Sequence, residues 1–312
     1  MSVTTIDCEY FDLPEVAAAF LVREGDRAAF VETNTTRAVP RLLAALEAEG
    51  LGPEAVDWVI ITHVHLDHAG GAAALMEACP NATLLCHPAA ARHVIDPSKL
   101  VKSSIAVYGE ERFRQLYGTI APIDAARVRT MEDGETLEWG TRTLTFLHTR
   151  GHANHHFCIL DSGSGGIFTG DSFGLFYPAL QKKGRFAFPT STPTDFDAEA
   201  AIESVERIAA SGATRAFFTH FGEGDDLGAI AAQLVPQLEA FGAIVDEADA
   251  SGLDGEALDA FCDQRVRAHF DALLAARGLD DPEVRRAMEL DVELDAQGLA
   301  FAVKKRRFKR DA

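Results

Sequence analysis

The sequence of 312 residues contains few cysteines and no long hydrophobic run. No Cys-x-x-Cys pair occurs among its five scattered cysteines, which argues against a disulfide framework and against a cysteine-based zinc site. No stretch of about 18 apolar residues is free of charge, so we predict no membrane partner. The N-terminus is acidic where a signal peptide would be basic, and a cytoplasmic location is therefore expected.

Basic residues are also scarce. The chain has 29 lysines and arginines against 48 aspartates and glutamates, a formal net charge of −19. Proteins that bind nucleic acid use Lys and Arg to neutralise phosphates, so this charge predicts no nucleic-acid partner. One basic stretch stands out at the C-terminus, over residues 304–310. We expect its side chains to be solvated or to pair with acidic groups.

The order of apolar runs and turn residues predicts a layered α/β domain. Short, continuously apolar runs are typical of buried strands, and segments with helical spacing of apolar residues alternate with them. The predicted strands cover 16–24, 27–33, 57–63, 81–87, 127–149 (a meander), 155–171 (a hairpin) and 214–220. The predicted helices cover 39–50, 70–79, an inserted segment at 98–126, and 198–211, with a long loop over 174–196.

The last part of the chain differs in composition. From about residue 226 the sequence becomes acidic and alanine-rich, with helical periodicity. We therefore predict a main domain over 1–225 and an α-helical extension over 226–312. Within the extension, 288–303 fits either a helix or a hairpin around Gly298.

The strongest motif is Thr-His-Val-His-Leu-Asp-His-Ala-Gly-Gly at 62–71. It holds four possible metal ligands within six residues, between a predicted buried strand and a predicted helix: His63, His65, Asp67 and His68. Ligands on such a loop are clustered, supported by rigid elements and open to a substrate, as a catalytic metal site requires. Three more possible ligands each follow a predicted strand: His152, Asp171 and His220. Together they suffice for a two-metal site.

This pattern resembles the metallo-β-lactamase superfamily. The family's His-x-His-x-Asp-His signature matches 63–68, and its later single His, Asp and His motifs match His152, Asp171 and His220 in order. The resemblance covers residues 15–222. Within the superfamily, the sequence is similar to the glyoxalase II-like branch of metallo-hydrolases. It implies a four-layer αββα sandwich with the metals at one edge of two packed sheets.

The resemblance also implies roles for the ligands. One metal would be held by His63, His65 and His152, and the other by Asp67, His68 and His220, with Asp171 bridging. Imidazole and carboxylate ligands suit two zinc ions, and also iron or manganese. Two positions depart from the family pattern. Glu32-Thr33-Asn34 stands where the family has Asp-Thr-Gly, and Arg150 stands where a proline precedes the Gly-His motif. Both departures concern residues that position the ligands.

These observations predict a dinuclear metal-dependent hydrolase of a small ester, thioester or lactone, acting through a hydroxide that bridges the metals. Asp67 and Asp171 are its expected catalytic residues. The chain has no Gly-x-Ser-x-Gly elbow and no phosphate-binding Gly-rich loop with Lys that would indicate other chemistry. We expect Phe176, Tyr177 and His156 to contact the substrate. Because family members commonly pair, a homodimer is also expected.

Two other activities remain open. The first is a mononuclear iron enzyme similar to persulfide dioxygenases, which one iron per chain and oxygen-dependent turnover would distinguish. The second is a nuclease, which the net charge disfavours. A secreted β-lactamase is disfavoured because no export signal is recognised, and a non-catalytic binding protein because all seven ligands are present.

Overall fold

The computed structural model describes residues 2–191 and 195–311. The chain divides into two compact units whose segments alternate along the sequence. Unit 1 comprises residues 1–148, 155–170 and 213–223, and unit 2 comprises residues 149–154, 171–212 and 224–312. The predicted domains, 1–225 and 226–312, divide the chain by another criterion and stay a prediction.

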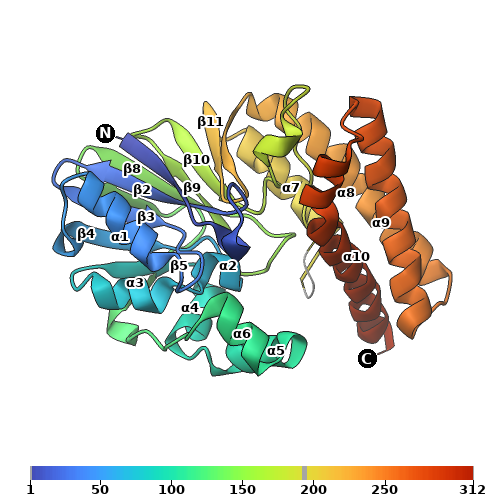
Figure 1. Cartoon of the computed structure of the whole chain (residues 1–312), viewed down its shortest axis with the longest axis horizontal. Helices are drawn as coiled ribbons and strands as arrows, with labels where there is room; N and C mark the ends of the chain where they lie inside the picture. Colours follow the sequence, from blue (N-terminus) through green and yellow to red (C-terminus); the bar gives the residue numbers. More distant parts are fainter. Residues whose placement is uncertain (1, 192–194, 312) are drawn as a thin grey trace. The chain divides into compact units, whose positions relative to one another are not determined.

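Two six-stranded mixed sheets form the framework (Figure 1). In the first sheet β1 to β3 are antiparallel and β3 to β6 are parallel: β1 (Ser2–Asp7), β2 (Ala18–Glu24), β3 (Arg27–Val31), β4 (Val56–Ile60), β5 (Thr83–Cys86) and β6 (Val128–Thr130). The second sheet has the order β12 to β7: β7 (Thr136–Trp139), β8 (Arg142–His148), β9 (Phe157–Asp161), β10 (Gly166–Gly170), β11 (Arg215–Phe218) and β12 (Gly222–Asp225).

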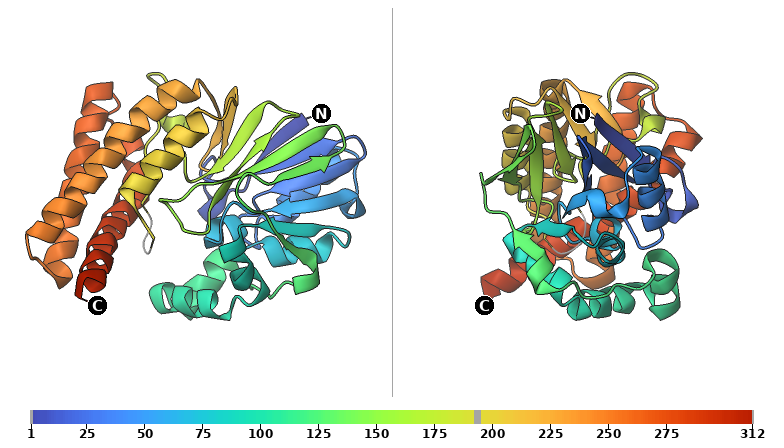
Figure 2. Two further views of the ribbon diagram at one scale, coloured as in Figure 1. Left: turned by 180° about the vertical axis from the view of Figure 1, so that it is seen from behind. Right: turned by 90° about the vertical axis from the view of Figure 1, so that its left-hand side faces the viewer.

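The core of unit 1 lies between the two sheets, which Figure 2 shows face to face. Alternate residues of the strands point into this layer, among them Phe20, Phe146, Phe157, Phe168 and Phe217, which are at most 1% exposed. The other face of the first sheet packs on three helices: α1 (Val39–Ala48), α3 (Ala72–Ala78) and α4 (Pro88–Ile95). The fold is therefore the predicted one, two mixed sheets flanked by helices.

A smaller apolar cluster joins the N-terminal loop to the inserted helices α5 (Ser98–Tyr108) and α6 (Glu110–Tyr117). Tyr10, Phe113 and Tyr117 are its buried aromatic residues, and Leu66 joins them from the short helix α2 (Leu66–Ala69). The helical turn of the loop that carries the His-x-His-x-Asp-His motif thus packs through Leu66 on this cluster and through Ala69 on the core between the first sheet and its helices.

Unit 2 is mostly helical, with α7 (Ala198–Ala209), α8 (Leu227–Ala250), α9 (Gly255–Arg277) and α10 (Pro282–Asp311). The last three helices lie side by side in Figures 1 and 2. By length and composition α8 could cross a membrane, but core helices of soluble proteins pass the same test. Its apolar face, including Ile230, Leu234 and Phe241, is buried within the unit.

The structure decides or corrects several expectations about local structure. Residues 288–303 are helical, as part of α10. The predicted meander at 127–149 is wrong in its first strand, because β6 pairs with β5 in the first sheet and only β7 and β8 form an antiparallel pair. The turn at Asp133-Gly134 therefore carries the chain from one sheet to the other. All five cysteines are buried and unbridged, as expected.

Candidate metal centre

The first four possible ligands lie on the loop between β4 and α3. β4 is buried, and α2 begins directly after His65, which places Asp67 and His68 in a short helical turn. The junction of α2 and α3 approaches the backbone of residues 33–35 closely: a Cβ on Gly71 would lie 2.7 Å from the carbonyl oxygens of Thr33 and Thr35. Glycine is therefore required here for the loop to take its path.

Asp67, His68 and His220 bring three donor atoms together within unit 1. His220 Nε2 lies 3.4 Å from His68 Nε2 and 3.4 Å from Asp67 Oδ2, and His68 Nε2 lies 3.8 Å from the same oxygen. Zinc in a tetrahedral site has bonds of about 2.0–2.2 Å, which separates neighbouring donor atoms by about 3.3 Å. The spacing of these side chains therefore fits one metal ion.

Hydrogen bonds fix which ring nitrogen of these histidines is available. His220 Nδ1 lies 2.9 Å from the carbonyl oxygen of Val16, and a carbonyl can only accept. His68 Nδ1 lies 3.1 Å from Oε1 of Glu32. Both Nδ1 atoms therefore donate, and each Nε2, which lies beside Asp67, is the nitrogen left to bind a metal. An imidazole held in this way by a hydrogen bond at one nitrogen presents the other nitrogen to a metal.

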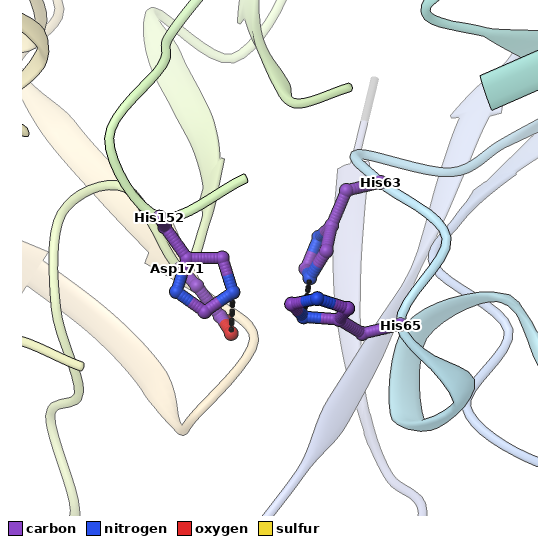
Figure 3. A group of neighbouring side chains, drawn as sticks. All are labelled: His63, His65, His152 and Asp171. Carbon is purple, nitrogen blue, oxygen red and sulfur yellow. Dashed lines mark hydrogen bonds and ion pairs between the residues drawn. The ribbon is translucent and has the colours of Figure 1, made fainter. Parts of the chain in front are cut away.

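The remaining ligands form two close pairs, one in each unit (Figure 3). In unit 1, His63 Nε2 lies 2.8 Å from His65 Nδ1. In unit 2, His152 Nε2 lies 3.3 Å from Oδ2 of Asp171, and His152 Nδ1 lies 3.3 Å from the carbonyl oxygen of Thr190. The carbonyl again selects the tautomer of His152 that directs a lone pair from Nε2 towards the carboxylate.

Glu32 supports these ligands from behind. Its side chain is buried, and Oε1 accepts hydrogen bonds from the hydroxyls of Thr62 and Thr219 in addition to His68 Nδ1. Thr62 precedes His63 and Thr219 precedes His220, so one carboxylate ties together the two segments that carry these ligands. The sequence signal for this arrangement is the Thr-His dipeptide, which occurs both at 62–63 and at 219–220.

The other two residues of the Glu-Thr-Asn segment hold the ligand loop by its backbone. Thr33 Oγ1 donates to the carbonyl oxygen of His68 at 2.8 Å, and Asn34 Nδ2 donates to that of Asp67 at 3.0 Å. Glu32 and Asn34 have positive φ angles of 67° and 51°, an uncommon conformation for residues other than glycine. The departure from Asp-Thr-Gly therefore retains groups that position the loop.

The three predicted substrate residues are all buried. His156 is fully buried in unit 1, with its ring centroid 4.9 Å from that of His63. In unit 2, Phe176 and Tyr177 are 6% and 7% exposed, and Tyr177 Oη lies 3.3 Å from Asp291 Oδ1 on α10. Their contact with a substrate stays a prediction.

A second group of histidines lies outside the ligand set. The rings of His87 and His148 are 4.0 Å apart, and His87 Nδ1 accepts a hydrogen bond from the backbone N–H of Ala89 at the start of α4. Burial, followed by the neighbouring His148 and His155, lowers the pKa of His87 to about 4. His87 is therefore neutral at physiological pH and serves as the N-cap of α4.

Comparison with known proteins identifies the family. The profile of the metallo-beta-lactamase superfamily matches residues 13–220. The chain belongs to this superfamily. With a metallo-beta-lactamase fold-containing protein of Sulfurisphaera tokodaii it shares 28% identity over 156 residues, which are 49% of this chain and 55% of that protein. With the hydroxyacylglutathione hydrolase of Aeromonas hydrophila it shares 26% identity over 153 residues, 49% of this chain and 45% of the enzyme. The chain thus spans about half the length of these curated relatives.

The solved structures extend the likeness over the whole fold. A metallo-beta-lactamase superfamily protein from Sulfolobus tokodaii superposes with a TM-score of 0.66 and 18% identity, covering 96% of this chain and 98% of that one. Membership of the metallo-beta-lactamase superfamily and the two groups of His and Asp side chains together support a dinuclear metal site in this chain.

Proposed function

We propose that this protein is a dinuclear metal-dependent hydrolase of a small ester, thioester or lactone. The observation that carries the proposal is the arrangement of Asp67, His68 and His220, whose donor atoms have the spacing of ligands on one ion and whose histidines are held in the metal-binding tautomer. The hydroxyacylglutathione hydrolase among the relatives supports the proposal that the protein is a hydrolase, and it favours a thioester as the substrate.

We assign the metals as the family pattern implies. His63, His65 and His152 would hold one zinc ion, Asp67, His68 and His220 the other, and Asp171 would bridge them. The division into two groups is supported by the donor atoms that these side chains offer, with Asp171 in the group of His63, His65 and His152; its bridging role is taken from the family pattern. When bound, two zinc ions supply a nucleophile at neutral pH by lowering the pKa of water towards about 7, and they polarise the carbonyl of the substrate.

The protein's own residues provide the geometry. Asp67 is the most accessible ligand of its group, with 26% of its side chain exposed against 0% for His68 and 8% for His220. We therefore assign to Asp67 the contact with the reacting groups, where its carboxylate can accept a hydrogen bond and orient the attacking oxygen. Glu32 keeps His68 fixed, so that the site needs little rearrangement during the reaction.

The remaining features of the proposal concern partners and location. A net charge of −19 supports a small molecule rather than nucleic acid as the substrate. We also propose that the protein is cytoplasmic, has no membrane partner and forms a homodimer. Size-exclusion chromatography with light scattering tests the homodimer.

Metal content per chain is the first test. Protein purified without added metal is analysed for its elements, and its activity is measured on a thioester, a lactone and an ester. Two zinc equivalents and hydrolysis of one of these substrates are expected. One iron per chain with oxygen consumption would overturn the proposal in favour of sulfur oxidation, and a metal-free active protein would overturn it outright.

Asp171 provides the matching variant. Asp171→Ala should lose metal and activity together, whereas Glu239→Ala, which removes an exposed carboxylate on α8, should lose neither. Full activity of Asp171→Ala would contradict the bridging assignment.

A further inference from the structure

The last helix is linked to the long loop that precedes α7. Within unit 2, α10 contacts this loop through four polar pairs: Glu283 with Lys182, Asp291 with Tyr177, Asp295 with Ser191, and Lys305 with Asp195. Three of these pairs involve side chains that are at least partly accessible to water. The pair of Asp295 and Ser191 is different, because both residues are 0% exposed.

The carboxylate of Asp295 is hydrogen-bonded to Ser191. Its Oδ1 accepts hydrogen bonds from the backbone N–H of Ser191 at 2.6 Å and from the Ser191 hydroxyl at 3.1 Å. Its Oδ2 has no hydrogen-bond partner among the described residues. Gly298, one turn further along α10, lets the helix approach, since a Cβ there would lie 1.4 Å from the carbonyl oxygen of Ser191.

A buried carboxyl group with an unpartnered oxygen is costly, because it has left water without full compensation. Burial raises the pKa of Asp295 well above the ordinary value for aspartate. No cation compensates for this burial in the contacts that the structure gives Asp295. What the side chain supplies in return is a fixed acceptor for Ser191, which holds the loop against α10.

Ser191 is adjacent to the residue that orients a ligand. The carbonyl oxygen of Thr190 accepts the hydrogen bond from His152 Nδ1 at 3.3 Å, and His152 Nε2 is then directed at Asp171 Oδ2. Thr190 and His152 are both less than 9% exposed. A continuous connection therefore runs within unit 2 from α10 through Ser191 and Thr190 to His152.

We propose that Asp295 is a positioning residue for the metal site, acting through Ser191 and Thr190 on the orientation of His152. The inference rests on the proposed function, because it assigns His152 as a ligand. It gives the C-terminal helix a role in metal binding although α10 itself supplies none of the assigned ligands. Partners that orient a ligating histidine typically change metal affinity by about 10- to 100-fold when removed; Asp295 acts one residue further away, so the lower value applies.

The test compares two substitutions at one position. Asp295→Asn keeps an oxygen that can accept from Ser191, whereas Asp295→Leu has the same branching at Cγ and no acceptor. Lys304→Ala is the matched control, because it removes a pair between α10 and Asp259 on α9 without touching the loop. Zinc affinity is measured by competition with a chromophoric chelator, and the ligand geometry by the visible absorption spectrum of the cobalt-substituted protein.

Asp295→Leu is expected to weaken one of the two zinc equivalents by about tenfold and to change the cobalt spectrum. Asp295→Asn and Lys304→Ala should stay within threefold of the wild type. Unchanged affinity and spectrum in Asp295→Leu would overturn the inference. If that variant does not fold, Asp295→Ala replaces it, because it also removes the acceptor for Ser191, and an unchanged cobalt spectrum there has the same meaning. Failure of the wild type to bind metal would defeat the proposed function instead.

Discussion

Replacing Glu32 tests how far the ligands depend on one buried carboxylate. Oε1 of Glu32 accepts hydrogen bonds from Thr62, Thr219 and His68. Glu32→Gln retains the shape and an acceptor oxygen but removes the charge. Hydrogen bonds to charged groups contribute about 1.5–3 kcal/mol, against about 0.5–1.5 kcal/mol for neutral ones. Glu32→Gln is therefore expected to lose about 1–2 kcal/mol of zinc-binding free energy, which corresponds to about tenfold weaker zinc binding.

Glu32→Ala removes the acceptor altogether. Two hydroxyls and an imidazole N–H then remain buried without it, and each such group costs about 1–3 kcal/mol. We expect the metal-free protein to lose at least about 3 kcal/mol of unfolding free energy, measured by urea denaturation, and zinc affinity to fall by about 100-fold, measured by chelator competition. Glu239→Gln on the exposed face of α8 is the control. Zinc affinity within twofold of the wild type in Glu32→Ala would refute the reasoning.

Three further predictions concern stability. The native pKa of His87, about 4, lies below the unfolded value of 6.5, so the unfolded chain binds more protons between these values and stability falls as pH drops through this window. His87→Asn should remove up to about 3 kcal/mol of this acid sensitivity, measured by urea unfolding at pH 7 and pH 4.5; parallel pH profiles would contradict it. Asp295 affects the pH dependence of stability in the opposite direction, because its raised native pKa makes stability fall as pH rises above about 4. Asp295→Asn should therefore become more stable relative to the wild type as pH rises. A difference in stability that does not change with pH would contradict this. Arg307 donates to two backbone carbonyls in the last turn of α8 and to that of Leu253 after it, and Arg307→Ala should cost about 1–3 kcal/mol in thermal unfolding. The exposed Arg310→Ala should cost less than about 1 kcal/mol; equal costs would contradict this prediction.

Much of the fold could be predicted because local pattern and global fold agree. The apolar run at 58–61 lies largely in the buried strand β4, and the turn residues at 162–166 join an antiparallel pair. The pairing of β6 could not be predicted, since three residues give no periodic signal and the partner strand lies more than forty residues earlier. β1 was not predicted either, because its mixed polar and apolar residues are only partly buried.

The basic tail illustrates how tertiary contacts decide between alternatives. The sequence predicted that its side chains are either solvated or paired with acidic groups, and the structure shows pairing. The pairs are Lys304 with Asp259, Lys305 with Asp195, Arg306 with Asp246, and both Arg307 and Arg310 with Asp249. All these acidic partners lie in unit 2. Residues 288–303 could not be assigned from periodicity alone, because this part of α10 is stabilised by tertiary contacts with α8, α9 and the loop over 174–196.

In the candidate site, the local sequence predicts the ligands, whereas tertiary contacts determine how they are oriented. The ligand types and their order are local features of the sequence, and a spacing of two or three residues is enough to bring His65, Asp67 and His68 onto one loop. The state of each ligand is not local: the tautomer of His220 depends on the carbonyl of Val16, that of His68 on Glu32, and that of His152 on Thr190. A chain could therefore keep all seven ligands and still bind metal poorly. Val16 and Thr190 act through backbone carbonyls, which a substitution does not remove, so Glu32 is the supporting position where a substitution measures how much of the metal affinity the fold itself provides.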